Sequence, residues 1–62
     1  MKHYYIIKTE IGTHIIIDTR TGKDFSGYDF MGGVEWADCS RDAYHMDKDE
    51  ADAILADLEA AD

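Results

Sequence analysis

Residues 47–61 read DKDEADAILADLEAA, and this stretch decides the fold. Its apolar side chains recur at the spacing of one helical face, at Ala51, Ile54, Leu55, Leu58 and Ala61. Asp47 is a suitable N-cap, and Glu50 follows three residues later, as in a capping box. The pattern therefore predicts an amphipathic helix over about residues 48–60, with its apolar stripe turned towards a second layer.

Two apolar segments at the start of the chain predict that second layer. Residues 3–9 (HYYIIKT) and 13–19 (THIIIDT) are rich in aromatic and β-branched residues, and Gly12 lies in the short connection between them. An antiparallel hairpin is expected, with alternate side chains on opposite faces. The face expected to be buried carries Tyr5, Ile7, Ile15 and Ile17. The other face is also apolar, and is either partly covered or a contact surface; it carries Tyr4, Ile6 and Ile16.

Glycines punctuate the centre of the chain. Residues 20–23 (RTGK) predict a turn, and a third strand is expected to start at Lys23 or Asp24. Residues 26–33 (SGYDFMGG) are interpreted as a mobile loop that carries aromatic side chains. Residues 34–38 (VEWAD) predict another short strand, and Ser40 is a candidate cap for a single helical turn that ends near Ala43.

Together these elements predict an α+β fold, a small antiparallel sheet of three or four strands packed against one C-terminal amphipathic helix. Residues 1–62 are enough for a single domain. Ordering the chain is opposed by about 1.5 kcal/mol per residue, so apolar burial leaves only a modest net stability. The expected core consists of Tyr5, Ile7, Ile15, Ile17, Trp36, Ile54, Leu55 and Leu58.

The net charge is concentrated in the C-terminal part of the chain. Residues 1–34 contain as many acids as bases, whereas residues 35–62 contain ten acids and only two bases, Arg41 and Lys48. The second part therefore carries the formal charge of −8 of the entire chain. A one-sided negative field repels nucleic acid and anionic membranes and attracts basic protein surfaces. We expect a basic protein as partner, with no direct binding of nucleic acid and no membrane binding.

The sequence also favours a cytoplasmic location. The longest apolar runs are residues 4–7 and 15–17, far short of the roughly 20 residues of a membrane-spanning helix. The start of the chain has no signal-peptide pattern. Cys39 is the only cysteine, and a lone thiol suits a reducing compartment.

Metal and catalytic chemistry find little support in the sequence. No pair among His3, His14, Cys39 and His45 has the spacing of zinc ligands. The acids that start at Asp47 fail the calcium-loop pattern, since its glutamate position falls on Leu58. A nucleophile would have to be Cys39, Ser26 or Ser40, with His45 or His14 as base, and nothing in the spacing pairs them. We therefore expect no catalytic residue, no metal and no cofactor.

The aromatic segment around Tyr28, Phe30 and Met31 has two interpretations. Exposed aromatic and methionine side chains beside acids are typical of interface anchors. Alternatively, Phe30 and Met31 close the open end of a small core, and this second interpretation is the favoured one.

From Trp36 onward the sequence resembles the end of many small phage-encoded proteins. The resemblance lies in Trp36, in residues 43–46 (AYHM) and 47–51 (DKDEA), and in Ile54 and Leu58. A tyrosine-rich opening such as residues 4–8 starts a hairpin in those proteins, and residues 25–33 look like an insertion. Several small acidic phage proteins of this kind are anti-CRISPR proteins, some of which act as DNA mimics on a Cas subunit. The resemblance implies a CRISPR effector subunit as partner and the cytoplasm of a bacterial host as location.

Two hypotheses follow. The first is a non-enzymatic, anti-CRISPR-like inhibitor whose acids occupy a basic nucleic-acid-binding surface by DNA mimicry. Its partner-binding residues would be Glu35, Asp38, Asp42, Asp49, Asp52, Asp57 and Glu59, with Tyr28 and Phe30 as apolar anchors. The second is a small homodimeric structural or adaptor module, in which the acidic face serves solubility and the uncovered hairpin face forms the contact.

Overall fold

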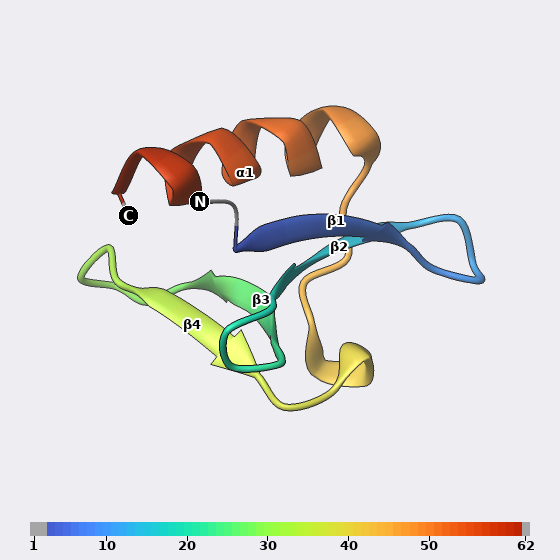
Figure 1. Cartoon of the computed structure of the whole chain (residues 1–62), viewed down its shortest axis with the longest axis horizontal. Helices are drawn as coiled ribbons and strands as arrows, with labels where there is room; N and C mark the ends of the chain where they lie inside the picture. The colour runs from blue at the N-terminus through green and yellow to red at the C-terminus, as the bar shows by residue number, and fades with distance from the viewer. Residues whose placement is uncertain (1–2, 62) are drawn as a thin grey trace.

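The computed structural model describes residues 3–61, a four-stranded antiparallel sheet with one α-helix across a face (Figure 1). The strands lie in the order β1-β2-β3-β4. The elements are β1 Tyr4–Lys8, β2 His14–Asp18, β3 Lys23–Tyr28, β4 Val34–Ala37, the 3-10 helix η1 Ser40–Asp42 and α1 Lys48–Ala61. The predicted α+β fold is confirmed. Lys2 and Asp62, two of the charged residues counted above, lie outside the described residues.

Helix α1 begins where the sequence predicts it. The Glu50 N–H donates to Asp47 Oδ1 at 2.7 Å, and the Ala51 N–H donates to the Asp47 carbonyl oxygen at 2.9 Å, so Asp47 is the N-cap. The helix ends one residue beyond the expected boundary. The second half of the predicted capping box is not formed, because the Glu50 carboxylate accepts a hydrogen bond from the Tyr44 hydroxyl instead.

The first two strands form the predicted hairpin, but the assignment of its faces is wrong. The core beneath α1 contains Tyr4, Ile6 and Ile16, and Ile16 is fully buried. Tyr5 and Ile7, which were expected in the core, are 48% and 42% exposed on the opposite face. Both faces of this hairpin are apolar, so alternation along the strands does not determine which one the helix covers.

The third strand continues into the segment interpreted as a mobile loop. Residues 26–28 belong to β3, and the preceding Phe25 is fully buried. The register shifts between Phe25 and Gly27, where a bulge leaves Gly27 at φ +131°, a conformation that side chains rarely adopt. Gly27 therefore allows an irregular strand instead of ending it, and residues 29–33 alone connect β3 to β4.

Aromatic rings form much of the core. The Trp36 ring stacks on Tyr4, with centroids 5.9 Å apart and an interplanar angle of 11°. It also meets Phe25 edge to face at 6.2 Å. The expected core positions Trp36, Ile54, Leu55 and Leu58 are confirmed, since Leu58 is buried and the other three pack against the cluster partly buried.

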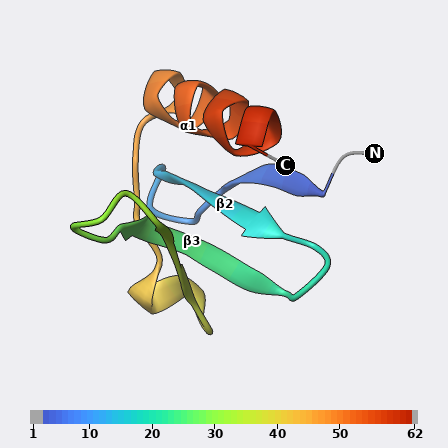
Figure 2. The same ribbon diagram turned by 90° about the vertical axis from the view of Figure 1, so that its left-hand side faces the viewer.

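The sheet opens between β2 and β3, and a later segment fills the opening. The two strands pair only near the turn that joins them. Further along, Met46 exchanges two backbone hydrogen bonds with His14, at 2.8 and 3.0 Å, and the Tyr44 N–H donates to the Phe25 carbonyl oxygen at 2.8 Å. Residues 43–46 thereby lead the chain from η1, on one side of the sheet, to α1 on the other (Figures 1 and 2).

The expected helical turn after Ser40 is confirmed as η1, which lies on the side of the sheet away from α1. Cys39, not Ser40, occupies its N-cap position, and its side chain makes no capping hydrogen bond to a backbone N–H of the helix. Ile15 is only 4% exposed although it points away from α1, whereas Ile17 is half-buried. This side of the sheet is therefore covered at one end only, and Tyr5 and Ile7 stay exposed.

A buried carboxylate joins the end of β2 to the turn that follows. Asp18 is 5% exposed and accepts hydrogen bonds from the Arg20 backbone N–H at 2.9 Å and from the Arg20 guanidinium at 3.2 Å. The same guanidinium donates to the Tyr4 hydroxyl at 2.8 Å. The hydrogen bond from the Arg20 side chain, helped by the backbone bond, outweighs burial and holds the pKa of Asp18 below its ordinary value.

A second buried carboxylate, Asp24, lies in a contrasting environment. It is 7% exposed and stands on β3 opposite Ile17 on one side and Ala37 on the other. Burial disfavours the ionised form and raises the pKa of Asp24 above its ordinary value. The two aspartates are thus expected to affect folding stability in opposite directions.

Candidate functional site

The largest group of acids lies on α1. The helix carries Asp49, Glu50, Asp52, Asp57 and Glu59, all of them exposed, and a single base. That base, Lys48, pairs with Asp52 at 2.6 Å. At 1.5 Å per residue the helix is about 21 Å long, and its five acids fall in two groups, at residues 49–52 and 57–59. The mean density, one acid per about 4 Å, is close to the roughly 3.4 Å between phosphates along one DNA strand, but the acids are not evenly spaced.

The other three acids proposed from the sequence lie on parts of the molecule away from α1. Glu35 is exposed on β4, where it alternates with the core-facing Val34 and Trp36. Asp38 follows β4, and its Oδ1 lies 3.5 Å from Lys23 Nζ. Asp42 belongs to η1 (Figure 1). The seven acids proposed from the sequence therefore do not form one surface: four lie on the helix, and the other three lie on β4 or on the η1 side of the sheet.

The two aromatic anchors proposed from the sequence are also separated. Phe30 is 98% exposed and Met31 82% exposed in the β3–β4 connection, so the interpretation that they close the core is wrong. The carboxylate of Asp29 organises this connection, accepting from the N–H groups of Met31 at 2.9 Å and Gly33 at 2.8 Å. Tyr28 instead lies at the end of β3, where its ring meets the Phe25 ring with centroids 5.3 Å apart.

Tyr28 forms part of a groove between β3 and the first turns of α1. We call it the tyrosine groove; its volume is about 290 Å³ and it is lined by Phe25, Gly27, Tyr28, Tyr44, Glu50 and Ile54. Phe25 and Ile54 come from the core, whereas Tyr28 and Tyr44 are 48% and 39% exposed.

Tyr44 and Glu50 are joined inside the tyrosine groove. The Tyr44 hydroxyl donates to Glu50 Oε2 at 2.5 Å. This hydrogen bond, followed by the charge of Glu50, raises the pKa of the Tyr44 phenol above its ordinary value. The Tyr44 ring meets Phe25 at a centroid distance of 6.1 Å. The groove therefore combines three aromatic rings with one carboxylate held in place.

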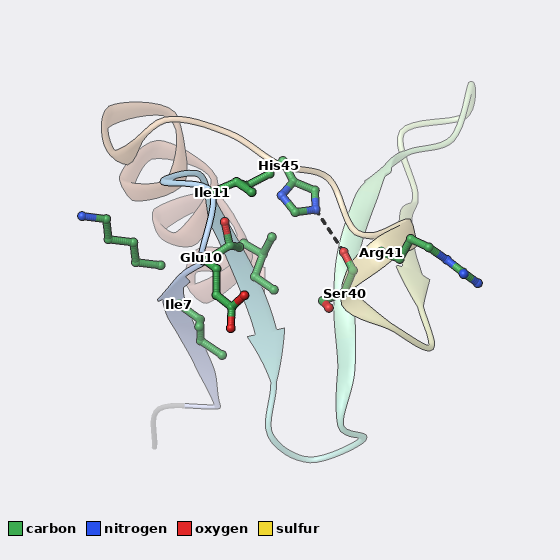
Figure 3. A pocket seen from close by; sticks show the side chains of 9 residues that line it. Ile7, Glu10, Ile11, Ser40, Arg41 and His45 are labelled. Atoms are coloured by element: carbon green, nitrogen blue, oxygen red, sulfur yellow. Dashed lines mark hydrogen bonds between the residues drawn. The ribbon is translucent and has the colours of Figure 1, made fainter.

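A second groove lies between the β1–β2 connection and η1 (Figure 3). We call it the isoleucine groove; its volume is about 710 Å³, and its lining includes Ile7, Ile11, Ile15, Ser40, Arg41 and His45. Figure 3 shows Ile7, Glu10 and Ile11 on one side of it and Ser40 and Arg41 on the other.

His45 is fixed by two hydrogen bonds at this groove. Its Nε2 lies 3.0 Å from the Ser40 carbonyl oxygen, which accepts only, so Nε2 carries a proton. In the neutral ring Nδ1 then accepts from the Thr13 hydroxyl at 2.7 Å, and Thr13 in turn lies 2.7 Å from the Thr9 hydroxyl. Both ring nitrogens are therefore engaged, and neither is bonded to the side chain of Ser40 or Cys39. The Cys39 thiol donates to Asp42 instead, at 3.4 Å.

Over residues 3–61, no group of three or more His, Cys, Asp and Glu side chains is arranged to hold a metal ion. In the same range, no helix is long and apolar enough to cross a membrane.

No protein-family model, curated protein or solved structure matches this chain. Sequence reasoning found Tyr28 but missed Tyr44 and Glu50, because Glu50 was assigned to the helix cap and Tyr44 lay in a stretch of ambiguous structure. The short separation of these two residues along the chain was the one available signal.

Proposed function

We propose that this protein is a non-enzymatic inhibitor that binds the basic, nucleic-acid-binding surface of a target protein. The observation that carries the proposal is the exposed surface of α1, with five acids and one base that is itself paired. A basic surface that has evolved to bind phosphates attracts such a helix and gains the same type of ion pair. The proposed contact surface is α1 alone, because the other three acids proposed from the sequence lie on other parts of the molecule. These three are Glu35, Asp38 and Asp42.

The proposed target follows from the resemblance described for the sequence. Several small acidic phage proteins of the kind that this chain resembles are anti-CRISPR proteins, so a CRISPR effector subunit is the first target to test. An inhibitor of such a complex would act in the cytoplasm of a bacterial host. Phosphate mimicry further requires that binding weaken as salt is raised and compete with the nucleic acid of the effector.

The test is to neutralise the α1 acids without changing the shape of the helix. In the variant D49N/D52N/D57N/E59Q we expect affinity for a purified effector to fall about tenfold at low salt, because four ion pairs with the basic surface are weakened. Affinity is measured by calorimetry at two salt concentrations, and helicity by circular dichroism.

The matched control carries the same change in net charge on other parts of the molecule, in the variant E10Q/E35Q/D38N/D42N. This variant is expected to bind almost as tightly as the native chain. Equal weakening by both variants would show that net charge alone steers association. Unchanged binding by the α1 variant would contradict the proposal, as would failure of the nucleic acid to compete.

A second candidate function is a homodimeric structural or adaptor module, and one observation favours it. Tyr5 and Ile7 are 48% and 42% exposed on the face of the sheet away from α1, beside the half-buried Ile17. They belong to β1, an edge strand, and Ile7 continues into the isoleucine groove. This apolar surface replaces the one expected from the sequence, since Tyr4, Ile6 and Ile16 are covered by α1.

Oligomeric state tests the second candidate. If the surface that carries Tyr5 and Ile7 forms a dimer, the mass measured by light scattering at about 1 mM protein rises towards that of two chains. Ile7→Lys is then expected to keep the chain monomeric, because it places a charge in the contact. Phe30→Lys is the control, since Phe30 is 98% exposed in the β3–β4 connection, outside the strands and outside the lining of the isoleucine groove. A monomer mass for the native chain at that concentration would contradict the dimer.

A further inference from the structure

We propose that the tyrosine groove binds the guanidinium group of an arginine side chain on the partner protein. The inference rests on the proposed function for the source of the arginine, a basic partner surface. The residues of the groove themselves favour a guanidinium, and small arginine probes can test this preference without the partner.

The aromatic lining is suited to a cation. Tyr28 and Tyr44 meet the Phe25 ring at interplanar angles of 72° and 77°, so neither is stacked against it. Both tyrosines are substantially exposed, and their ring surfaces can therefore be reached from solvent. Aromatic faces attract cations electrostatically, most strongly where water is partly excluded. A tyrosine whose hydroxyl donates to a carboxylate has a more electron-rich ring, which strengthens this attraction at Tyr44.

The charge of the groove has the matching sign. Glu50 is the one charged residue in its described lining. Oε2 of Glu50 accepts from Tyr44, whereas Oε1 has no hydrogen bond to any residue of the range 3–61 and can accept from a ligand. Asp47 and Asp49 flank Glu50 at the start of α1, so the surroundings add further negative charge. The hydrogen bond from Tyr44 also fixes the position of the carboxylate before any ligand arrives.

The size and shape of the groove favour a single side chain. Its volume of about 290 Å³ lies just below the range typical of small-molecule pockets, roughly 300–1,000 Å³. A guanidinium is planar, stacks on aromatic rings and donates several hydrogen bonds in one plane. An ammonium is more strongly hydrated and gains less from aromatic contact. Arginine is therefore expected to bind more tightly than lysine.

The experiment uses small probes and the whole chain. N-acetyl-arginine-methylamide is titrated into labelled protein, and chemical shifts are followed by NMR, with the citrulline analogue as an uncharged probe of nearly the same shape. We expect shifts centred on Tyr28, Tyr44 and Glu50 with the arginine probe, and about tenfold weaker binding of citrulline. Equal binding of the two probes would overturn the proposal, and so would shifts centred elsewhere.

A pair of variants distinguishes the effect of the groove carboxylate on binding from the effect of the net charge of the helix. Glu50→Gln and Glu59→Gln remove the same charge from the same helix, but only Glu50 lines the groove. Glu50→Gln is expected to weaken the arginine probe about tenfold, and Glu59→Gln by less than about twofold. Equal weakening by the two variants would overturn the proposal. Unfolding followed by Trp36 fluorescence confirms that both variants are folded.

The failure of one proposal can be distinguished from the failure of the other. An arginine probe that binds the groove while no effector binds α1 would support the guanidinium preference of the groove but remove the proposed function, and with it the proposed source of the arginine. An effector that binds through α1 while the probe fails to bind would do the reverse.

Discussion

Replacing Phe25 with alanine is expected to lower the free energy of unfolding by about 3–5 kcal/mol. Phe25 is fully buried, and its ring contacts those of Tyr28, Trp36 and Tyr44. A chain of 62 residues has a total stability of only about 3–9 kcal/mol, so this variant should lose a large share of it, and should be unfolded if the native stability lies at the lower end of that range. Urea denaturation followed by Trp36 fluorescence and circular dichroism measures the effect.

Phe30→Ala is the matched control, because it removes the same side chain from a position that is 98% exposed. Its unfolding free energy should stay within about 0.5 kcal/mol of the native value. Similar losses in the two variants would contradict the packing described for β3, since they would place Phe25 outside the core.

Replacing Asp18 with asparagine is expected to lower stability by about 2 kcal/mol at neutral pH, a typical value for hydrogen bonds to a charged group. Asp18 is nearly buried and holds the Arg20 guanidinium, which in turn bonds the Tyr4 hydroxyl. Because the folded state lowers the pKa of Asp18 below 3.8, its contribution is present above that pH and is lost as pH falls through the folded-state pKa. The difference between native and variant proteins should therefore shrink in acid.

Asp24→Asn is the control, because it is expected to change the free energy of unfolding in the opposite direction. Burial raises the pKa of Asp24 above 3.8, so ionisation of this carboxyl opposes folding as pH rises through the folded-state value. The variant should be more stable than the native chain at neutral pH, and the gain should vanish in acid. Urea midpoints between pH 3 and pH 7 compare the two variants. If the urea midpoint changed with pH in the same way for both variants, this would contradict the environments assigned to the two aspartates.

The helix and the hairpin could be predicted from the sequence because their signals are local. Helix α1 has a regular apolar stripe and a cap at Asp47, and β1 and β2 are joined across Gly12. The choice of buried face could not be predicted, because it depends on where α1 docks. Phe25 was missed for a related reason: the glycines after it resemble a loop, whereas Gly27 forms a bulge within the strand.

The candidate sites show the same division between local and long-range information. The charge excess of α1 is visible in the sequence, but the separation of Asp38 and Asp42 from it appears only once the chain has crossed the sheet. The tyrosine groove brings Tyr28 from β3 together with Tyr44 from the crossing segment. Such contacts depend on tertiary packing, which periodicity along the chain does not encode.

The crossing of residues 43–46 through the sheet also has a consequence for protein synthesis. While the chain is being translated, all four strands can emerge before this segment does, and their sheet then has unpaired backbone groups at His14 and Phe25. Those groups can pair with water or with another nascent chain. Residues 43–46 close the opening from within the same molecule, and α1 follows directly. A ribosome stalled ahead of this segment would therefore display an incomplete, aggregation-prone sheet, and the native domain can form only once the helix has also emerged.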